Sequence, residues 1–409
     1  MKITVLGAGA IGSAVAYDLC RRPEVARVQV CEARPVTLRA YRSAHTHANL
    51  RTYETDARDV QTLEPILAGS ACVVSCVGPE LNPRLARLAV DLGAHFVDLG
   101  GADLASEDDA PDHGGLVRDG LAHGTLASLA ERRQRHVVTG CGLAPGLAGM
   151  LAMRGLARLD TATAARIRVG DVPTDPDAPF RYRLAHSAEK LLDDYTTPAQ
   201  VLRDGRVETR APLTGIEHLD VAGMGPMEAF YTGGGLGTLA EALEGQLASL
   251  DAKTLRFPGH ADQMRFLLDL GLADRTHLDV RTHLSYRDVL VRRLRQRLGG
   301  AYRDAVVVRV EIEGEAGGEA GTLVYDLVDR FDEASGLSAM QRCTGFPAAA
   351  AAVLLAERRV PGGGVGAAEQ VLPVEPLLAM LAERGLHVAE RWEPARTPAR
   401  EPAHEPQPG

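Results

Sequence analysis

Residues 3–32 read ITVLGAGAIGSAVAYDLCRRPEVARVQVCE: a short apolar run, a glycine-rich turn, and then a segment with its apolar residues on one side. Ile3 to Leu6 predicts a buried strand, and Ile11 to Leu19 predicts a helix that begins directly after the turn. A second apolar alternation, Val28 to Cys31, predicts another strand. A strand, a tight turn, a helix and a second strand form the βαβ unit of a parallel sheet.

The turn carries the spacing Gly7-x-Gly9-x-x-Gly12 between that strand and that helix. Gly7 permits the tight turn, Gly9 lets the backbone approach a pyrophosphate, and Gly12 allows the helix to pack closely on the strand. The free N–H groups at the start of the helix favour an anion. We therefore predict a dinucleotide site here, which Ala10 and Ile11 also line.

Glu32 ends the second strand, about twenty residues after Gly12. An acidic side chain at this place accepts hydrogen bonds from the adenosine ribose hydroxyls, which favours NAD. Arg34 offers an alternative partner for a 2′-phosphate, so NADP stays open as the cofactor. Residues at the ends of later strands are expected to line the rest of the dinucleotide: Asp56, Ala57, Ser75, Cys76, Val77 and Gly78.

The pattern of the chain changes at about Ala165. Before it, strands alternate with helices, as in Cys72 to Val77 followed by Asn82 to Leu92, which predicts a doubly wound parallel sheet. From Ala165 to Glu333 period-two alternation dominates. The predicted fold class is α/β: a Rossmann-type doubly wound sheet plus an inserted α+β substrate domain with a mixed or antiparallel sheet.

These patterns divide the chain into four expected parts. They are a Rossmann domain over residues 1–125, a substrate-binding and dimerisation domain over 126–340, C-terminal helices over 341–392 that return to the first domain, and a disordered tail over 393–409. A homodimer or higher homo-oligomer is expected because the long second sheet has an edge to cover.

Composition excludes several classes of partner. Lys and Arg total 45 against 54 Asp and Glu, a formal net charge of -9, which argues against a nucleic-acid partner. No run of eighteen apolar residues predicts a membrane span, and the N-terminus lacks a secretory signal, so we expect a cytoplasmic protein. Six scattered cysteines without a CxxC pair indicate reduced thiols and no metal.

Several longer strings, taken together and in order, resemble the saccharopine dehydrogenase superfamily, and most closely its lysine 6-dehydrogenase type. They extend over nearly the whole chain to about Arg391. The strings are CVGPELNPRLARLAVDLGAHFVDLGG (76–101), TGCGLAPGLAGMLA (139–152), HSAEKLLDDYTTPAQVLRDGRV (186–207), FYTGGGLGTLAEALEG (230–245), KTLRFPGH (253–260) and MQRCTGFPAA (340–349).

The resemblance implies an NAD-dependent amino-acid dehydrogenase that oxidises the ε-amine of L-lysine. The imine would hydrolyse to the semialdehyde and ammonia. Saccharopine-forming relatives carry an acid where this chain has Ala144, which weighs against saccharopine as the substrate. Two alternatives remain: a saccharopine- or carboxynorspermidine-type reductase that joins an amine to a keto acid, and a sensor that binds NAD(H) without chemistry.

Amine oxidation requires a group that takes a proton, because hydride leaves only a neutral amine and a lysine ammonium has a pKa of about 10.4. Asp98, at the end of its strand in VDLGG, is the first candidate, although it can equally cap the turn before Gly100. His186, Glu189 and His260 are the alternative bases.

Arg256 is the candidate partner for the substrate α-carboxylate, with hydroxyl donors from Tyr231, Thr232 and Thr344. Each has a structural alternative. Arg256 and His260 flank a Pro-Gly pair and fit a surface turn, Tyr231 and Thr232 fit ordinary strand positions, and Thr344 fits a helix N-cap.

Overall fold

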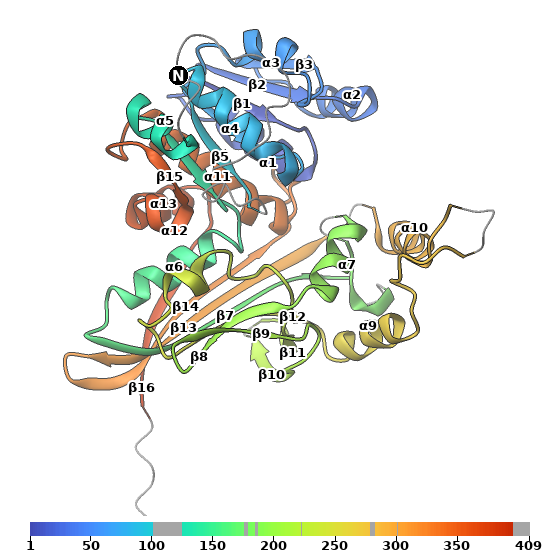
Figure 1. Cartoon of the computed structure of the whole chain (residues 1–409), viewed down its shortest axis with the longest axis vertical. Helices are drawn as coiled ribbons and strands as arrows, with labels where there is room; N and C mark the ends of the chain where they lie inside the picture. The colour runs from blue at the N-terminus through green and yellow to red at the C-terminus, as the bar shows by residue number, and fades with distance from the viewer. Residues whose placement is uncertain are drawn as a thin grey trace, which may run out of the picture.

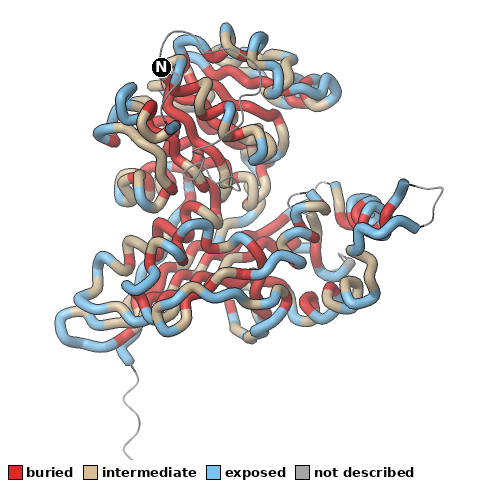
Figure 2. Tube along the Cα trace, in the orientation of Figure 1, coloured by how far each residue is buried: buried red, intermediate tan, exposed pale blue. Residues whose placement is uncertain are grey.

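The structure is a computed structural model that describes residues 1–100, 125–175, 179–184, 187–221, 223–278, 283–300 and 302–395. The described chain forms two sheets, a seven-stranded parallel one and a nine-stranded mixed one, stacked along the long axis of the molecule (Figure 1). Buried residues occupy the centre of both (Figure 2). The predicted fold class is confirmed.

The first sheet has the order β15-β6-β5-β4-β1-β2-β3, so the chain reverses direction across the sheet at its first strand. β1 pairs in parallel with β2 on one side and with β4 on the other, and ligands of such sheets bind at this switch point. The strands are β1 (Lys2–Leu6), β2 (Arg27–Glu32), β3 (Leu50–Glu54), β4 (Cys72–Ser75), β5 (His95–Asp98), β6 (His136–Thr139) and β15 (Gly364–Ala367).

The helices of this layer are α1 (Ala10–Cys20), α2 (Pro35–Ala44), α3 (Val60–Leu67), α4 (Asn82–Asp91) and α5 (Leu126–Arg133). The sequence analysis did not predict α2. This helix begins with a proline in its first turn, where the fixed backbone angle of proline suits a helix. β6 belongs to this sheet, so the nucleotide layer extends past the expected boundary at residue 125.

Seven strands of the second sheet follow the order β10-β11-β12-β7-β13-β14-β16, and the other two lie off this path, with β8 paired to β12 and β9 paired to β8. Its central strand β7 (Thr161–Pro173) is parallel to β12 (Ser249–Arg256) and antiparallel to β13 (Asp304–Ala316), so the sheet is mixed. The other strands are β8 (Ala199–Arg203), β9 (Arg206–Arg210), β10 (Glu217–Val221), β11 (Gly225–Phe230), β14 (Glu319–Arg330) and β16 (Ala389–Pro394). β16 carries regular pairing to residue 394, beyond the expected start of the tail at 393.

Helices cover the second sheet: α6 (Leu147–Leu156), α7 (Ala188–Thr196), α8 (Leu239–Ala242), α9 (His260–Asp269) and α10 (Tyr286–Leu298). In Figure 1 α7, α9 and α10 lie at one end of the sheet, and α6 lies between the two layers. No helix among the described residues is long and apolar enough to cross a membrane.

Helix α11 (Ala339–Ala356) joins the two layers. Its first amides, those of Ala339 and Met340, donate to the buried Asp304 carboxylate of β13 at 2.7 and 2.9 Å. Farther along, a Cβ built at Gly345 would lie 3.0 Å from the Ala14 Cβ of α1, so only a small residue lets these helices approach so closely. α11 therefore fixes the nucleotide layer to the second sheet.

The C-terminal helices α12 (Ala368–Val371) and α13 (Val374–Ala382) end at a buried ion pair. The Arg384 guanidinium lies 2.9 Å from the Asp18 carboxylate of α1, and the two side chains are 1% and 3% exposed. This pair joins the segment that follows α13 to the first helix.

Asp18→Asn should lower the free energy of unfolding by roughly 3–5 kcal/mol, because it leaves the Arg384 charge buried without its counter-ion. Urea denaturation measures the change. Glu383→Gln is the matched control, since Glu383 is 69% exposed and lies 3.9 Å from Arg22, and about 0.5 kcal/mol or less is expected. Equal effects of the two substitutions would contradict the anchoring role of the buried pair.

Candidate functional site

The glycine turn lies at the carboxyl edge of β1. Gly7 has a φ of +94°, and a Cβ there would lie 2.9 Å from the Cys76 carbonyl oxygen. A Cβ on Gly12 would collide with the Gly7 carbonyl oxygen, whereas one on Gly9 would meet no atom within 4 Å. Gly7 and Gly12 are thus required by the fold, and Gly9 faces open space. Gly9 caps α1 without a side chain, so the helix N-terminus is free to receive a pyrophosphate.

Glu32 lies beside this turn. Its carboxylate accepts hydrogen bonds from the Ala8 and Arg34 backbone amides, both at 2.9 Å, and from the Arg34 Nε at 3.0 Å. Burial alone would raise the pKa of Glu32, but the hydrogen bonds from Arg34 and Ala8 outweigh it and hold the pKa below its usual value. The ionised carboxylate is placed for ribose hydroxyls. The Arg34 side chain would have to leave it to reach a 2′-phosphate.

The other predicted dinucleotide residues follow neighbouring strands. Ser75 to Gly78 continue β4 at the same edge, and the Cys76 Cβ lies 3.3 Å from a Cβ built at Gly12. Burial raises the pKa of Cys76 to about 12, so it stays a thiol. Asp56 and Ala57 follow β3, two strands away from the turn, and Asp56 caps its own loop by accepting from the Arg58 amide at 2.9 Å.

Asp98 ends β5 and caps the turn that follows it. Its Oδ1 accepts from the Gly100 amide at 2.7 Å and from the Gly140 amide at 3.0 Å, so it caps the turn and ties β5 to the end of β6. Its Oδ2 is buried and has no hydrogen-bond partner within the described chain. Burial raises the pKa of Asp98, against the effect of the two amides.

A proline connects Asp98 to the second sheet. A Cβ built at Gly100 would lie 2.8 Å from the Pro145 side chain, one at Gly140 3.3 Å, and one at Gly237 3.1 Å. The loop of residues 233–237 also reaches the second sheet, because a Cβ at Gly235 would lie 3.1 Å from the Ala252 Cβ of β12. This glycine loop therefore lies between the Asp98 turn and one face of the second sheet.

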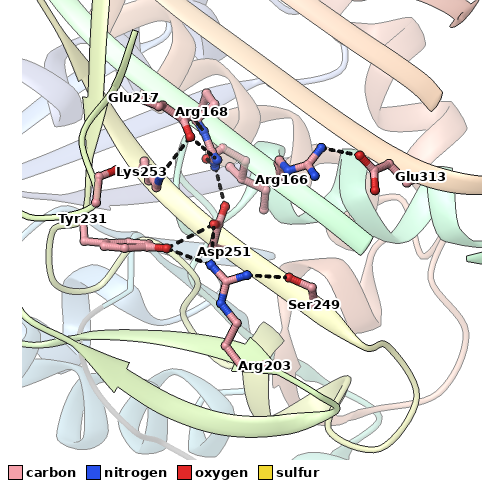
Figure 3. Close-up of polar contacts among 11 residues, drawn as sticks. Arg166, Arg168, Arg203, Glu217, Tyr231, Ser249, Asp251, Lys253 and Glu313 are labelled. Atoms are coloured by element: carbon pink, nitrogen blue, oxygen red, sulfur yellow. Dashed lines mark hydrogen bonds and ion pairs between the residues drawn. The ribbon is translucent and has the colours of Figure 1, made fainter. Parts of the chain in front are cut away.

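The alternation of side chains separates two predicted substrate residues. The Thr232 hydroxyl is 2.7 Å from that of Thr254, which shares the face of Ala252 toward the glycine loop. Tyr231 points to the opposite face, where its hydroxyl donates to Asp251 at 3.3 Å (Figure 3). There it joins a paired network of charges formed by Arg168, Arg203, Glu217, Asp251 and Lys253. Only Thr232 of the two lies toward the nucleotide layer.

Arg256 lies two residues beyond Thr254, on the same face of β12. It is 4% exposed and forms an ion pair with Asp171 at 3.1 Å, so the alternative of a surface arginine in a turn is wrong. His260 is also buried, and its Nε2 lies 3.0 Å from the Tyr195 hydroxyl. Burial and the charge of Arg256 lower the pKa of His260 to about 3, so the ring is neutral.

The remaining candidates are spread over the molecule. Glu189 pairs with Arg295 of α10, which lowers the pKa of Glu189. Thr344 lies inside α11, not at its N-cap, which is Ser338. Its methyl group would be 3.4 Å from a Cβ on Gly142, so it borders the loop between β6 and α6. His186 lies outside the described residues.

Three polar side chains were not predicted as site residues from the sequence. Thr254 was readable from sequence, since its spacing of two from Arg256 predicts a shared face. Glu369 lies two residues after β15, at the carboxyl edge of the first sheet where Asp98 ends β5, and burial raises the pKa of Glu369. Asp171 gave no sequence signal, because its partner is 85 residues away. No group of three or more His, Cys, Asp or Glu suited to a metal occurs in the part of the chain that is described.

Comparisons with known proteins agree with this geometry. The model of the saccharopine dehydrogenase NADP-binding domain matches residues 3–119, and that of the saccharopine dehydrogenase C-terminal domain matches residues 142–386. The superfamily prediction is confirmed, and an NAD(P) cofactor is supported.

Two solved structures share the fold over nearly the whole chain. Saccharopine dehydrogenase (L-Glu forming) from Saccharomyces cerevisiae is 17% identical, with a TM-score of 0.76 over 96% of this chain and 99% of that one. Homospermidine synthase from Legionella pneumophila, solved with NAD, is 12% identical, with a TM-score of 0.63 over 100% and 95%. The chain belongs to the saccharopine dehydrogenase family of NAD(P)-dependent oxidoreductases, which act on CH–NH or CH–NH2 groups.

Proposed function

We propose that this protein oxidises a basic amino acid with NAD, most specifically L-lysine at its ε-carbon, to give the semialdehyde, ammonia and NADH. The observation that carries this proposal is the free Oδ2 of Asp98, a buried carboxylate oxygen at the ligand edge of the first sheet. Such an oxygen is suited to take a proton from a substrate ammonium.

In this proposal Asp98 acts twice. Its Oδ1 stays fixed by the Gly100 and Gly140 amides while its Oδ2 accepts the proton of the ammonium, which leaves a neutral amine. The bound nicotinamide supplies the acceptor for the hydride from the amine-bearing carbon. The protonated Asp98 first releases that proton to solvent. The carboxylate then takes a proton from the water that adds to the iminium carbon and passes it to the nitrogen, so that the C–N bond breaks, ammonia leaves, and the hydroxyl loses its proton to give the aldehyde.

NAD is proposed as the preferred cofactor because of Glu32. Its ionised carboxylate lies beside the turn and would repel the 2′-phosphate of NADP. The competing proposal, reductive joining of an amine to a keto acid, uses the same cofactor site and the same amine chemistry. The two differ in which substrates the protein turns over.

Asp98→Asn distinguishes a catalytic role of Asp98 from a turn-capping role, because asparagine keeps the Oδ1 acceptor and replaces only the unpartnered oxygen. We expect kcat/KM for lysine to fall about a hundredfold or more, with NADH affinity and melting temperature nearly unchanged. Since burial raises the pKa of Asp98, activity should be present above that pKa and be lost as the pH falls through it.

The variant should lack this acid limb of the pH profile. Asp91→Asn, on the surface of the same layer, is the matched control with wild-type rates expected. If Asp98→Asn keeps its rate within threefold, Asp98 only caps the turn.

The purified protein should form NADH and release ammonia when offered L-lysine and NAD, and form product more slowly with NADP. The reaction is followed by absorbance of the reduced nicotinamide. Turnover of saccharopine, with lysine inert, would transfer the assignment to the condensing reductases. NADH binding without turnover of any amine would indicate a sensor.

We also propose a cytoplasmic homodimer. All six cysteines are free thiols, which fits a reducing compartment. Phe266 and Leu270, on one side of α9, are 67% and 64% exposed, and large exposed apolar side chains mark protein interfaces. Light scattering should give twice the mass of one chain, and serine at both positions should shift it toward one chain. A wild-type mass of one chain would refute the dimer.

A further inference from the structure

A second polar cluster lies at the end of the second sheet, away from Asp98. It contains the Asp171–Arg256 ion pair, Tyr182, Tyr302 and His260. Four buried atoms of this cluster have no hydrogen-bond partner within the described chain: Asp171 Oδ2, Arg256 Nε, and the hydroxyls of Tyr182 and Tyr302. Buried polar atoms are almost always bonded, so four together indicate a site built for an occupant.

The side chains face one another. Arg256 Nη1 lies 3.1 Å from Asp171 Oδ1, and the Arg256 guanidinium carbon lies 4.8 Å from the centre of the Tyr182 ring. Tyr182 contacts His260 edge to face at 5.1 Å. Tyr302 lies beside the end of β7 that carries Asp171, because Asp304 pairs with Pro173 and the Arg303 carbonyl accepts from the Thr174 amide at 2.9 Å. The free atoms therefore surround one ion pair, and they are not scattered through the core.

The charge of this cluster restricts what it can hold. The ion pair is neutral as a unit, so a lone carboxylate or a lone ammonium would leave an uncompensated charge in the interior. A group that carries both charges keeps the site neutral. Its carboxylate fits Arg256 Nε and the tyrosine hydroxyls, and its ammonium fits Asp171 Oδ2. The α-carbon of an amino acid bears this pair of groups.

The cluster faces the same side of the sheet as the proposed reaction site. Arg256, Thr254 and Ala252 alternate along one face of β12, and Ala252 contacts the glycine loop that packs on Pro145. α7 covers this end of the sheet, since Tyr195 bonds His260 and the Asp194 carbonyl accepts from the Gly233 amide at 2.8 Å. α7 therefore contacts both the cluster and the glycine loop.

We propose that Asp171 and Arg256, with the Tyr182 and Tyr302 hydroxyls, bind the α-ammonium and α-carboxylate of the substrate, so that the enzyme selects amino acids over simple amines. This rests on the proposed amine oxidation and adds the specificity residues Asp171, Tyr182 and Tyr302. The ammonium contact of Asp171 is the part that excludes substrates with a carboxylate alone.

The test compares substrates that lack one of the two α-groups with variants that lack one of the proposed binding groups. L-Lysine is compared with 6-aminohexanoate, which lacks the α-ammonium, and with 1,5-diaminopentane, which lacks the carboxylate. The wild-type protein should prefer lysine by about a hundredfold in kcat/KM. Asp171→Asn should reduce kcat/KM for lysine to the level of 6-aminohexanoate, with a much smaller loss for 6-aminohexanoate, which lacks the ammonium that Asp171 would bind. Equal losses for all three substrates, or a wild-type protein without preference, would overturn the proposal.

Tyr302→Phe keeps the test valid if Asp171→Asn does not fold. It removes only a hydroxyl without a partner, so stability should be retained while the preference for lysine falls about tenfold. Tyr41→Phe, which deletes an unpartnered buried hydroxyl in the nucleotide layer, is the matched control and should keep the full preference. An unchanged preference in Tyr302→Phe contradicts the role of its hydroxyl.

Failure of the subsite and failure of the proposed reaction give different results. If no amine is oxidised, calorimetry with L-lysine, 6-aminohexanoate and the NADH-bound protein tests the subsite directly. Binding of lysine that Asp171→Asn weakens at least tenfold supports the subsite without the reaction. Absence of lysine binding by the wild-type protein rejects it.

Discussion

Two hydrogen bonds to one oxygen of Asp98 determine how the carboxyl edge of the first sheet is arranged. The Gly100 and Gly140 amides converge on Oδ1 and hold the ends of β5 and β6 together. Pro145 packs on both glycines, and the glycine loop of residues 233–237 packs on Pro145. The position of the near face of the second sheet, which is the face toward this glycine loop, therefore depends on the same contact. Since both amides use one oxygen, the other remains without a hydrogen-bond partner within the described chain.

The two faces of the second sheet differ in how their charges are satisfied. On the far face, which points away from the glycine loop, Arg168 and Lys253 both form ion pairs with Glu217, and Arg168 also pairs with Asp251 (Figure 3). These charges are therefore neutralised within their own network. On the near face, the Asp171–Arg256 pair retains free atoms although it is buried. A closed network stabilises a fold, whereas an open one at similar burial is the arrangement expected of a binding site. This difference is the reason for proposing the binding site on the near face.

Local patterns predicted the fold well, and contacts distant in sequence escaped prediction. The β1 turn and α1 followed from neighbouring residues, because each glycine is required by atoms close in the chain. Asp98 was placed correctly at a strand end, but its second amide comes from Gly140 across β6. The Asp171–Arg256 pair depends on the register of two strands that 75 residues separate, and no local signal reports that register. Tyr231 and Thr232 were grouped although adjacent strand residues face opposite ways.

The nucleotide layer is assembled from both ends of the chain. β15 pairs beside β6, α11 packs on α1, and Arg384 reaches Asp18. During synthesis, domains usually fold in the order in which they emerge from the ribosome. Here the first layer emerges early, but its outer strand β15 and the helix α11 that covers α1 are translated after strands β7 to β14 of the second sheet. The nascent protein therefore carries an unfinished cofactor domain, with a bare sheet edge at β6, until β15 has left the ribosome.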